Sequence, residues 1–211
     1  PAARRFRTTP MYEIWDGMGA VWGAQYGLEV PNYFARGGEP RFETPSFRRS
    51  NAWDATAREV RAVRTGVGIN ETHNFGKFRV TGAGARAWLD RIMAGRIPAP
   101  GRLSLTPMLA PSGRLIGDFT VSCLSEHEFQ LTASYGSQDF HLRWFEMHPD
   151  AGVTVENISD ARTGFQIAGP KARDVLAACT NADVSAAAFR FLDVRRMTIG
   201  MADCIVQRVS Y

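Results

Sequence analysis

The chain has 211 residues, of which 45% are hydrophobic and 22% charged, and its formal net charge is +4. This composition excludes a disordered chain, and the length accommodates one large core or two smaller ones. Only Lys77 and Lys171 are lysines, so nearly all the positive charge is guanidinium. Arginine prefers carboxylate or phosphate partners, although coding bias explains the same count equally well. Because the arginine pairs are scattered, we expect no nucleic acid partner.

Neither a metal site nor a membrane segment is expected. Cys123, Cys179 and Cys204 lie far apart without a histidine at metal-ligand spacing, and the four histidines form no H-x-x-x-H pair. Apolar runs fall short of the roughly 18 residues that a membrane span needs, and the first ten residues lack the core of a signal peptide. A soluble intracellular protein is the default expectation.

Residues 1–50 are dense in aromatic residues, glycine and proline and show little periodicity. Loops of this length are uncommon inside compact domains, so we interpret the segment as a long connector lying against something large. Its large aromatic side chains would then need a surface to cover, and these are Trp15, Trp22, Tyr26, Tyr33 and Phe34.

The next segments alternate between helix and strand patterns. Residues 53–65 have the apolar spacing of an amphipathic helix. Residues 78–89 and 165–176 resemble each other, and both predict a strand, a glycine turn and a helix. Further strands are expected at residues 115–123, 128–132 and 153–155, with a helix at about 137–147. Because helices do not regularly separate the strands, two related α+β units fit better than one doubly wound sheet.

The turn at residues 81–87 carries G-x-G-x-x-A between a strand and a helix, as in a dinucleotide-binding fingerprint. In the second copy Lys171 replaces the middle glycine, and no acidic residue follows at the distance of a ribose contact. A structural strand-to-helix turn is therefore the favoured interpretation over nucleotide binding.

The segment PMLAPSGRLIGDFTV, residues 107–121, is the most informative part of the chain. A turn at Pro111, Ser112 and Gly113 leads through Gly117 into a β-rich run, with Asp118 at the junction. A carboxylate held near a strand end can act as a general base or bind a cationic or N–H-bearing ligand. Taken alone, such an aspartate is more often a solvated turn residue.

Nine motifs in one order resemble the carboxyl-terminal half of the dimethylglycine dehydrogenase family. Sarcosine dehydrogenase and dimethylglycine oxidase are close relatives, and this half is similar to the glycine-cleavage aminomethyltransferase, or T-protein. The motifs lie at residues 7–12, 19–23, 26–35, 75–78, 106–109, 117–121, 141–146, 168–171 and 208–211.

The resemblance implies an α+β aminomethyltransferase fold with a ferredoxin-like inserted unit. Residues 1–50 would be the connector from a missing flavin domain, and residues 51–77 with 156–211 an incomplete first folate-binding unit. Residues 78–155 would form the inserted unit. In the family the chain continues past Tyr211 toward a glutamate that holds the pterin ring, so the resemblance implies truncation before a final barrel domain.

The resemblance also implies a chemistry. An amino-terminal FAD domain oxidises an N-methylated glycine to an iminium, and this half lets tetrahydrofolate capture the one-carbon unit as methylene-tetrahydrofolate. The family's G-D-[LF]-T-V aspartate falls on Asp118 as a buried general base or electrostatic stabiliser. The expected partners are the substrate, folate and the protein's own flavin domain. The compartment would be the bacterial cytoplasm, or the mitochondrial matrix in a eukaryote.

The expected folate contacts include Tyr211, Leu105, Met108, Leu109 and Tyr135. Leu105 stands where the aminomethyltransferase often has a folate-contacting tyrosine. Met108 and Leu109 would pack on the ring system or belong to the core, and Tyr135 would stack on the ligand or lie exposed in a turn.

The sequence leaves open the role of His141 and the function of the chain as a whole. His141 reads first as part of a helix packed through its aromatic face and only second as a substrate contact. A non-catalytic folate-fold scaffold, or a stand-alone aminomethyltransferase of glycine cleavage, remains the alternative function.

Overall fold

A computed structural model of the chain describes residues 4–209, which form two compact units. The first unit comprises Pro1–Asn74 and Thr163–Ala172, and the second comprises Phe75–Arg162 and Arg173–Tyr211. Both combine helices with antiparallel strands, so the predicted α+β class is confirmed. The three-part domain division stays a prediction. No helix in residues 4–209 is both long enough and apolar enough to cross a membrane.

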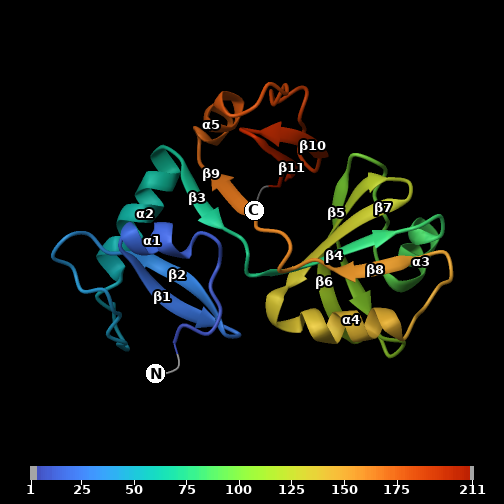
Figure 1. Ribbon diagram of the computed structural model, residues 1–211, viewed down its shortest axis with the longest axis horizontal. Helices are drawn as coiled ribbons and strands as arrows, with labels where there is room; N and C mark the ends of the chain where they lie inside the picture. The colour runs from blue at the N-terminus through green and yellow to red at the C-terminus, as the bar shows by residue number, and fades with distance from the viewer. Residues whose placement is uncertain (1–3, 210–211) are drawn as a thin grey trace. The chain divides into compact units, whose positions relative to one another are not determined.

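The first unit contains two antiparallel strand pairs, β1 with β2 and β3 with β9. The predicted helix at residues 53–65 is confirmed with the same bounds. The elements of this unit are α1 (Tyr12–Gly17), β1 (Ala20–Gln25), β2 (Leu28–Phe34), α2 (Trp53–Thr65), β3 (Gly68–Glu71) and β9 (Phe165–Ala168) (Figure 1).

Residues 1–50 contain regular secondary structure that their irregular residue spacing does not indicate, and their interpretation as a connector from a flavin domain stays a prediction. They contain α1 and the β1–β2 hairpin, because their aromatic side chains pack on one another within the segment. The ring of Tyr12 stacks on Trp22 at a centroid distance of 4.1 Å, and Trp15 meets Phe34 edge-on at 5.9 Å. Trp15 is buried as well, so much of this aromatic surface is covered inside the unit.

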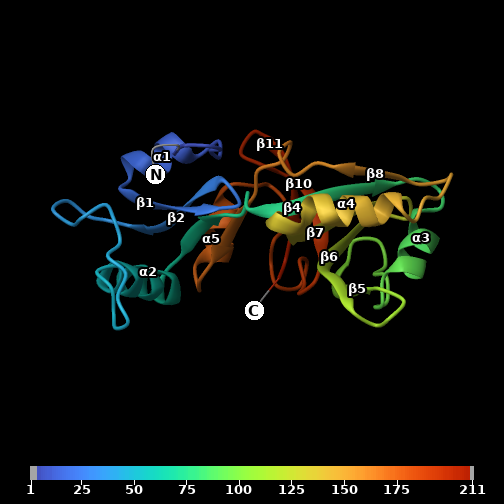
Figure 2. The ribbon, with the colours of Figure 1, turned by 90° about the horizontal axis from the view of Figure 1, so that it is seen from below.

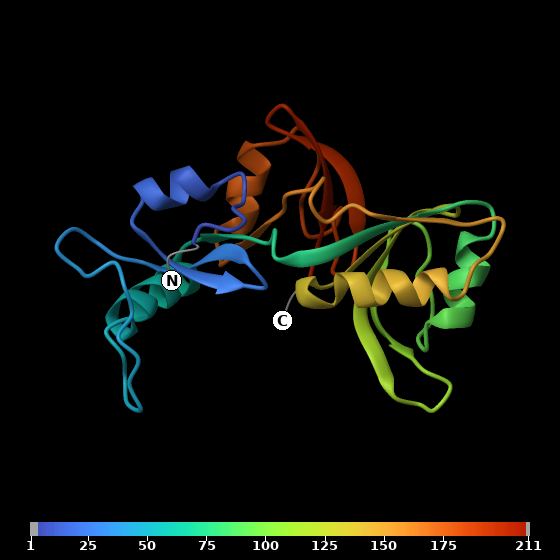
Figure 3. The same cartoon turned by 60° about the horizontal axis from the view of Figure 1, so that its bottom comes forward.

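The second unit is built on a five-stranded antiparallel sheet with the strand order β5-β6-β7-β4-β8. Figures 2 and 3 show α4 lying along this sheet. Its elements are β4 (Phe75–Thr81), α3 (Ala85–Ile92), β5 (Leu103–Leu109), β6 (Leu115–Ser125), β7 (Glu128–Ser134), a 3₁₀ turn (Tyr135–Ser137), α4 (Gln138–Glu146) and β8 (Thr154–Asn157). The hairpin of β10 (Val194–Ile199) and β11 (Ala202–Gln207) follows, after α5 (Ala172–Ala178), which begins at the boundary of the two units.

One face of the sheet, here called the packed face, carries the hydrophobic core of the second unit. Alternate residues of β4, β6 and β7 point to this face, and α3 and α4 cover it. Trp88 of α3 is 1% exposed, and its indole N–H donates to the His148 carbonyl at 2.6 Å. Full burial of such side chains is the main source of the unit's stability.

The opposite face, here called the open face, is covered at one end by the β10–β11 hairpin. The Gln207 side-chain amide donates to the Ser122 hydroxyl at 2.9 Å, and the Leu103 amide donates to the Leu192 carbonyl at 2.9 Å. Asp193 is 3% exposed and binds the Arg102 guanidinium and the Arg190 amide. These contacts close the Ser122 end of the open face and leave the other end uncovered.

The repeated strand, glycine turn and helix pattern is confirmed in both copies, β4 with α3 and β9 with α5. Gly82 has φ +125° and Gly169 has φ +117°, conformations that residues with a side chain rarely adopt. A Cβ at Gly82 would lie 2.0 Å from the Gly152 carbonyl oxygen, and one at Gly169 would lie 2.5 Å from the Gly66 oxygen. Both turns therefore require glycine, because the backbone has a positive φ and because a backbone oxygen occupies the space that a Cβ atom would need.

Candidate functional site

Asp118 lies near the start of β6 and is exposed on the open face of the sheet. The next residue, Phe119, is fully buried on the packed face, as strand alternation requires. The expectation of a buried carboxylate is therefore wrong, because the β10–β11 hairpin covers the Ser122 end of this face and not the Asp118 end. The carboxylate is accessible to a ligand from solvent.

The strand has a β-bulge directly before Asp118. Met108 pairs with Gly117 and Leu109 pairs with Leu115, so Ile116 is an extra residue in β6 with no counterpart on β5. Bulges bend a strand, increase its twist and re-aim the side chains that follow. The direction of the Asp118 side chain is therefore set by an irregularity that strand propensity alone does not predict.

Residues on neighbouring strands give Asp118 a mixed apolar and polar surrounding. Pro107 of β5 is its direct cross-strand partner, and Leu105 pairs with Thr120 on the same face. Leu105 is 66% exposed. An exposed leucine beside a hydroxyl and a carboxylate offers a flat ligand both apolar contact and hydrogen bonds.

The other predicted folate contacts are placed differently. Met108 is 0% exposed and belongs to the core cluster on the packed face, so the structure favours the core interpretation for this residue. Leu109 is 37% exposed at the end of β5. Tyr135 is 2% exposed, which excludes an exposed turn tyrosine, and Tyr211 lies outside the described residues.

The glycine-rich turn after β4 is occupied by the protein's own backbone. The Gly84 amide donates to the Gly152 carbonyl at 3.3 Å, and the space beside Gly82 is filled by that same carbonyl. These contacts account for both glycines of the G-x-G-x-x-A pattern. The structure thus supports the strand-to-helix turn over the nucleotide interpretation.

Two buried polar groups carry more contacts than the sequence indicated. Glu71 of β3 is 7% exposed and accepts hydrogen bonds from the Thr9 hydroxyl at 2.7 Å, the Trp15 indole at 3.0 Å and the Thr163 hydroxyl at 3.3 Å. It joins separate segments of the first unit. His141 of α4 is 1% exposed on the packed face, directly beneath the β6 bulge. The contacts of Glu71 have no sequence signal beyond the residue type, whereas the packed aromatic helix face expected for His141 is present, with its ring against Phe78 and Phe119.

Burial lowers the pKa of His141 below its ordinary value, and the hydrogen bond to the Ile116 carbonyl acts in the opposite direction. The neutral ring therefore donates its Nε2 proton to that carbonyl at 3.2 Å. Asp193 also titrates below its ordinary range. The Arg190 amide and the Arg102 guanidinium lower its pKa, while burial raises it.

The described residues also contain a hollow away from Asp118. A pocket of about 680 Å³ lies in the second unit, lined by residues 177–182 with 196–198 and Gly200, and it is broadly open. Within residues 4–209, no three His, Cys, Asp or Glu side chains come together as a metal site.

The fold is of the α+β class, and its candidate site is a carboxylate at a bulged strand on the open face of the sheet. Sequence comparison gives the family. The sequence profile of the GCVT N-terminal domain matches residues 11–211. The chain therefore belongs to this aminomethyltransferase-type family, and the resemblance deduced from its motifs is confirmed.

Individual relatives agree with this assignment. Mouse mitochondrial dimethylglycine dehydrogenase is 35% identical over 90% of this chain, and this chain spans 22% of that protein. The aminomethyltransferase of Bacillus subtilis is 31% identical over 97% of the chain, which spans 52% of that enzyme. The chain thus corresponds to about a fifth of the first relative and half of the second.

Solved structures share the fold. The aminomethyltransferase T of the glycine cleavage system from Bartonella henselae superimposes on 92% of this chain and 48% of its own, with a TM-score of 0.75 and 18% identity. Heterotetrameric sarcosine oxidase from Corynebacterium sp. U-96 matches 77% of this chain and 82% of its own, with a TM-score of 0.54 and 19% identity. At these identities the likeness concerns the fold alone.

Proposed function

We propose that this chain is the tetrahydrofolate-dependent one-carbon transfer part of a flavin-dependent N-methylglycine dehydrogenase. The substrate would be dimethylglycine or sarcosine, oxidised in a flavin domain that belongs to the same protein. The observation that carries the proposal is the 35% identity to dimethylglycine dehydrogenase over 90% of the chain, combined with an accessible Asp118 on the open face.

The residues of the open face fit a reduced folate. A pterin is flat and carries N–H groups, so it needs an apolar surface and a nearby acceptor. Leu105, 66% exposed, supplies the first, and the Asp118 carboxylate supplies the second. Thr120, which pairs with Leu105, adds a hydroxyl on the same face.

Bound tetrahydrofolate would supply the amine that takes up the one-carbon unit from the oxidised substrate. When a folate amine forms a bond to the iminium carbon, its nitrogen must lose a proton. Asp118 would accept that proton at its carboxylate and would stabilise positive charge while the bond forms. The transfer would be completed when the bond between that carbon and the substrate nitrogen breaks, and the demethylated amine would leave carrying the two protons that the folate nitrogens give up. Its exposure in the chain by itself is no obstacle, because a bound ring system would displace water from the carboxylate.

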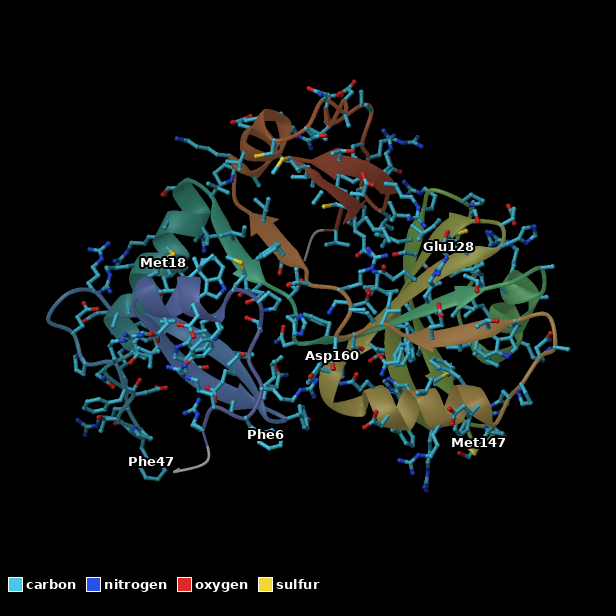
Figure 4. The ribbon with its side chains drawn as sticks, viewed as in Figure 1. Phe6, Met18, Phe47, Glu128, Met147 and Asp160 are labelled. Carbon is cyan, nitrogen blue, oxygen red and sulfur yellow. The ribbon has the colours of Figure 1, made fainter. Side chains whose placement is uncertain are left out.

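Exposed apolar side chains of the first unit support a larger protein with a further domain. Phe6 and Phe47 are 80% and 113% exposed and project from the ribbon (Figure 4), and Phe42, Ile14 and Met18 are more than half exposed. Large exposed apolar side chains are of the kind that a further domain would cover. We propose that the flavin domain is that partner.

The decisive experiment is Asp118→Asn in the complete gene product that carries this chain. We expect flavin reduction by the N-methyl amine to stay nearly unchanged, while methylene-tetrahydrofolate formation falls by about 10²–10⁴-fold, the range for general acid-base groups. The exposed Asp139→Asn on α4 is the matched control. Equal product formation by the Asp118 variant and the wild type would exclude the assignment.

A scaffold function is the second candidate, and one relative favours it. The mouse pyruvate dehydrogenase phosphatase regulatory subunit is 25% identical over 96% of this chain, and by its name it is a regulatory subunit. A scaffold predicts no folate binding by the complete protein. Calorimetric titration with tetrahydrofolate separates the two, since measurable binding supports one-carbon transfer.

A further inference from the structure

We propose that His141 is a positioning residue that holds the β6 bulge and thereby aims Asp118. This inference rests on the proposed role of Asp118 and adds a residue that never touches the ligand. His141 lies on the packed face and Asp118 on the open face. The imidazole therefore acts through the backbone of β6.

The first observation is the hydrogen bond to the bulged residue. The Nε2 atom of His141 lies 3.2 Å from the carbonyl oxygen of Ile116, the extra residue of β6. Ile116 has no counterpart on β5, so its place in the strand is not set by cross-strand pairing on that side. The imidazole fixes this carbonyl two residues before Asp118.

The second observation is the close fit at Gly117, between the bulge and Asp118. A Cβ at this position would lie 2.4 Å from Nε2 of His141 and 2.9 Å from its Cε1 atom. Glycine is needed here so that the strand can approach the imidazole. The ring also packs against Phe119 at a centroid distance of 4.7 Å, so His141 contacts the residues on both sides of Asp118.

The third observation is the cost of keeping a histidine in this place. His141 is 1% exposed, and within the described part of the chain its Nδ1 atom meets no hydrogen-bond partner. A leucine would fill such a core position without leaving a buried polar atom unsatisfied. The Nε2 bond to the bulge is the feature of this position that only a donor-bearing side chain reproduces.

Three substitutions in the complete gene product separate positioning from packing. His141→Gln keeps a donor near the Nε2 position, whereas His141→Asn moves it and His141→Leu removes it. We expect the Leu and Asn variants to lower methylene-tetrahydrofolate formation about 10- to 100-fold, as displacement of a catalytic group does. The Gln variant should recover most of that loss, and the KM for the N-methyl amine should stay constant.

Two further readouts make the result decisive. If His141 acts through Asp118, His141→Leu has no added effect on product formation in an Asp118→Asn background, whereas independent losses multiply. Hydrogen exchange followed by mass spectrometry should show faster exchange at residues 115–119 in the Leu variant and wild-type exchange in the Gln variant. His148→Leu is the control, because its ring nitrogen bonds the Trp144 carbonyl at the end of α4 and not β6.

The outcomes distinguish this inference from the proposed function. Unchanged exchange at residues 115–119 in His141→Leu overturns the positioning role, and so does multiplicative loss in the double variant. If Asp118→Asn alone has no effect on product formation, the proposed function fails and the catalytic role of His141 fails with it. The exchange measurement then still decides whether His141 holds the bulge.

Discussion

The two faces of the five-stranded sheet of the second unit are formed by alternating residues of the same strands, but they differ in burial. Phe119 and Asp118 are adjacent in β6, yet Phe119 is fully buried under α4 and Asp118 is exposed. The packed face specifies the fold through hydrophobic burial, and the open face leaves room for chemistry. His141 connects them, because it belongs to the packed face and bonds the strand segment that presents Asp118.

The largest effect is expected on the packed face, with Phe119→Ala. The Phe119 ring is 0% exposed and contacts Phe145 and His141, so its removal leaves a cavity among side chains that cannot fully collapse. We expect a loss of about 3–5 kcal/mol in the free energy of unfolding, measured by urea denaturation. Leu105→Ala on the open face is the control and should change it by less than about 0.5 kcal/mol. Similar losses of unfolding free energy in Phe119→Ala and Leu105→Ala would contradict the difference in burial between the two faces.

A smaller effect is expected at the turn that leads from the sheet into α3. Gly82→Ala places a methyl group 2.0 Å from the Gly152 carbonyl oxygen in a residue with φ +125°. Both the contact and the backbone conformation oppose the change, so we expect more than about 1 kcal/mol of destabilisation by thermal or urea unfolding.

Gly113 gives the matched control for that turn. Its φ is +80°, but a Cβ at this position would meet no atom within 4 Å, so Gly113→Ala retains the conformational cost and lacks the contact. We expect about 1 kcal/mol or less. A Gly82 variant that is no less stable than the Gly113 variant would show that the 150–152 loop moves aside freely.

The sequence predicts the regular parts of this fold because their causes are local. The helix at residues 53–65 and both strand-turn-helix copies follow from apolar periodicity and glycine turns. The helix and hairpin within residues 1–50 do not follow from the sequence pattern, since the stacking of Tyr12 on Trp22 depends on a hairpin that irregular spacing conceals. The predicted burial of Asp118 is wrong, because the position of the β10–β11 hairpin on the open face is a tertiary property.

The bulge at Ile116 is partly predictable from the sequence. The sequence marks Gly117 as a point of backbone freedom, but the reason for it is the imidazole of His141, which is distant in sequence. A glycine directly before a strand-borne aspartate is therefore a weak signal by itself. It becomes informative only when the residue that fills the space beside it is known.

The pH dependence of stability also differs between the two faces, through His141 on the packed face and Asp193 at the covered end of the open face. The folded-state pKa values of His141 and Asp193 both lie below their ordinary values of 6.5 and 3.8. In each case the unfolded chain binds a proton first as the pH falls, so stability decreases with decreasing pH. The His141 contribution declines below about pH 6.5 and the Asp193 contribution below about pH 3.8.

Urea denaturation from about pH 3 to about pH 7.5 covers both windows. In His141→Leu the decline that begins near pH 6.5 should disappear, and in Asp193→Asn the acidic decline should shrink. An unchanged slope between about pH 5 and about pH 6.5 in His141→Leu would contradict the buried neutral imidazole.

The smallest effect on stability is expected for Asp118→Asn. The side chain is exposed, and the change keeps its size and shape, so we expect the free energy of unfolding to change by less than about 0.5 kcal/mol in urea denaturation. Although Asp118 is adjacent to Phe119, Asp118→Asn should therefore leave the free energy of unfolding almost unchanged while it removes the proposed base. A loss greater than about 1 kcal/mol would mean that the carboxylate makes a structural contribution on the open face, and a fall in product formation would then no longer isolate proton transfer.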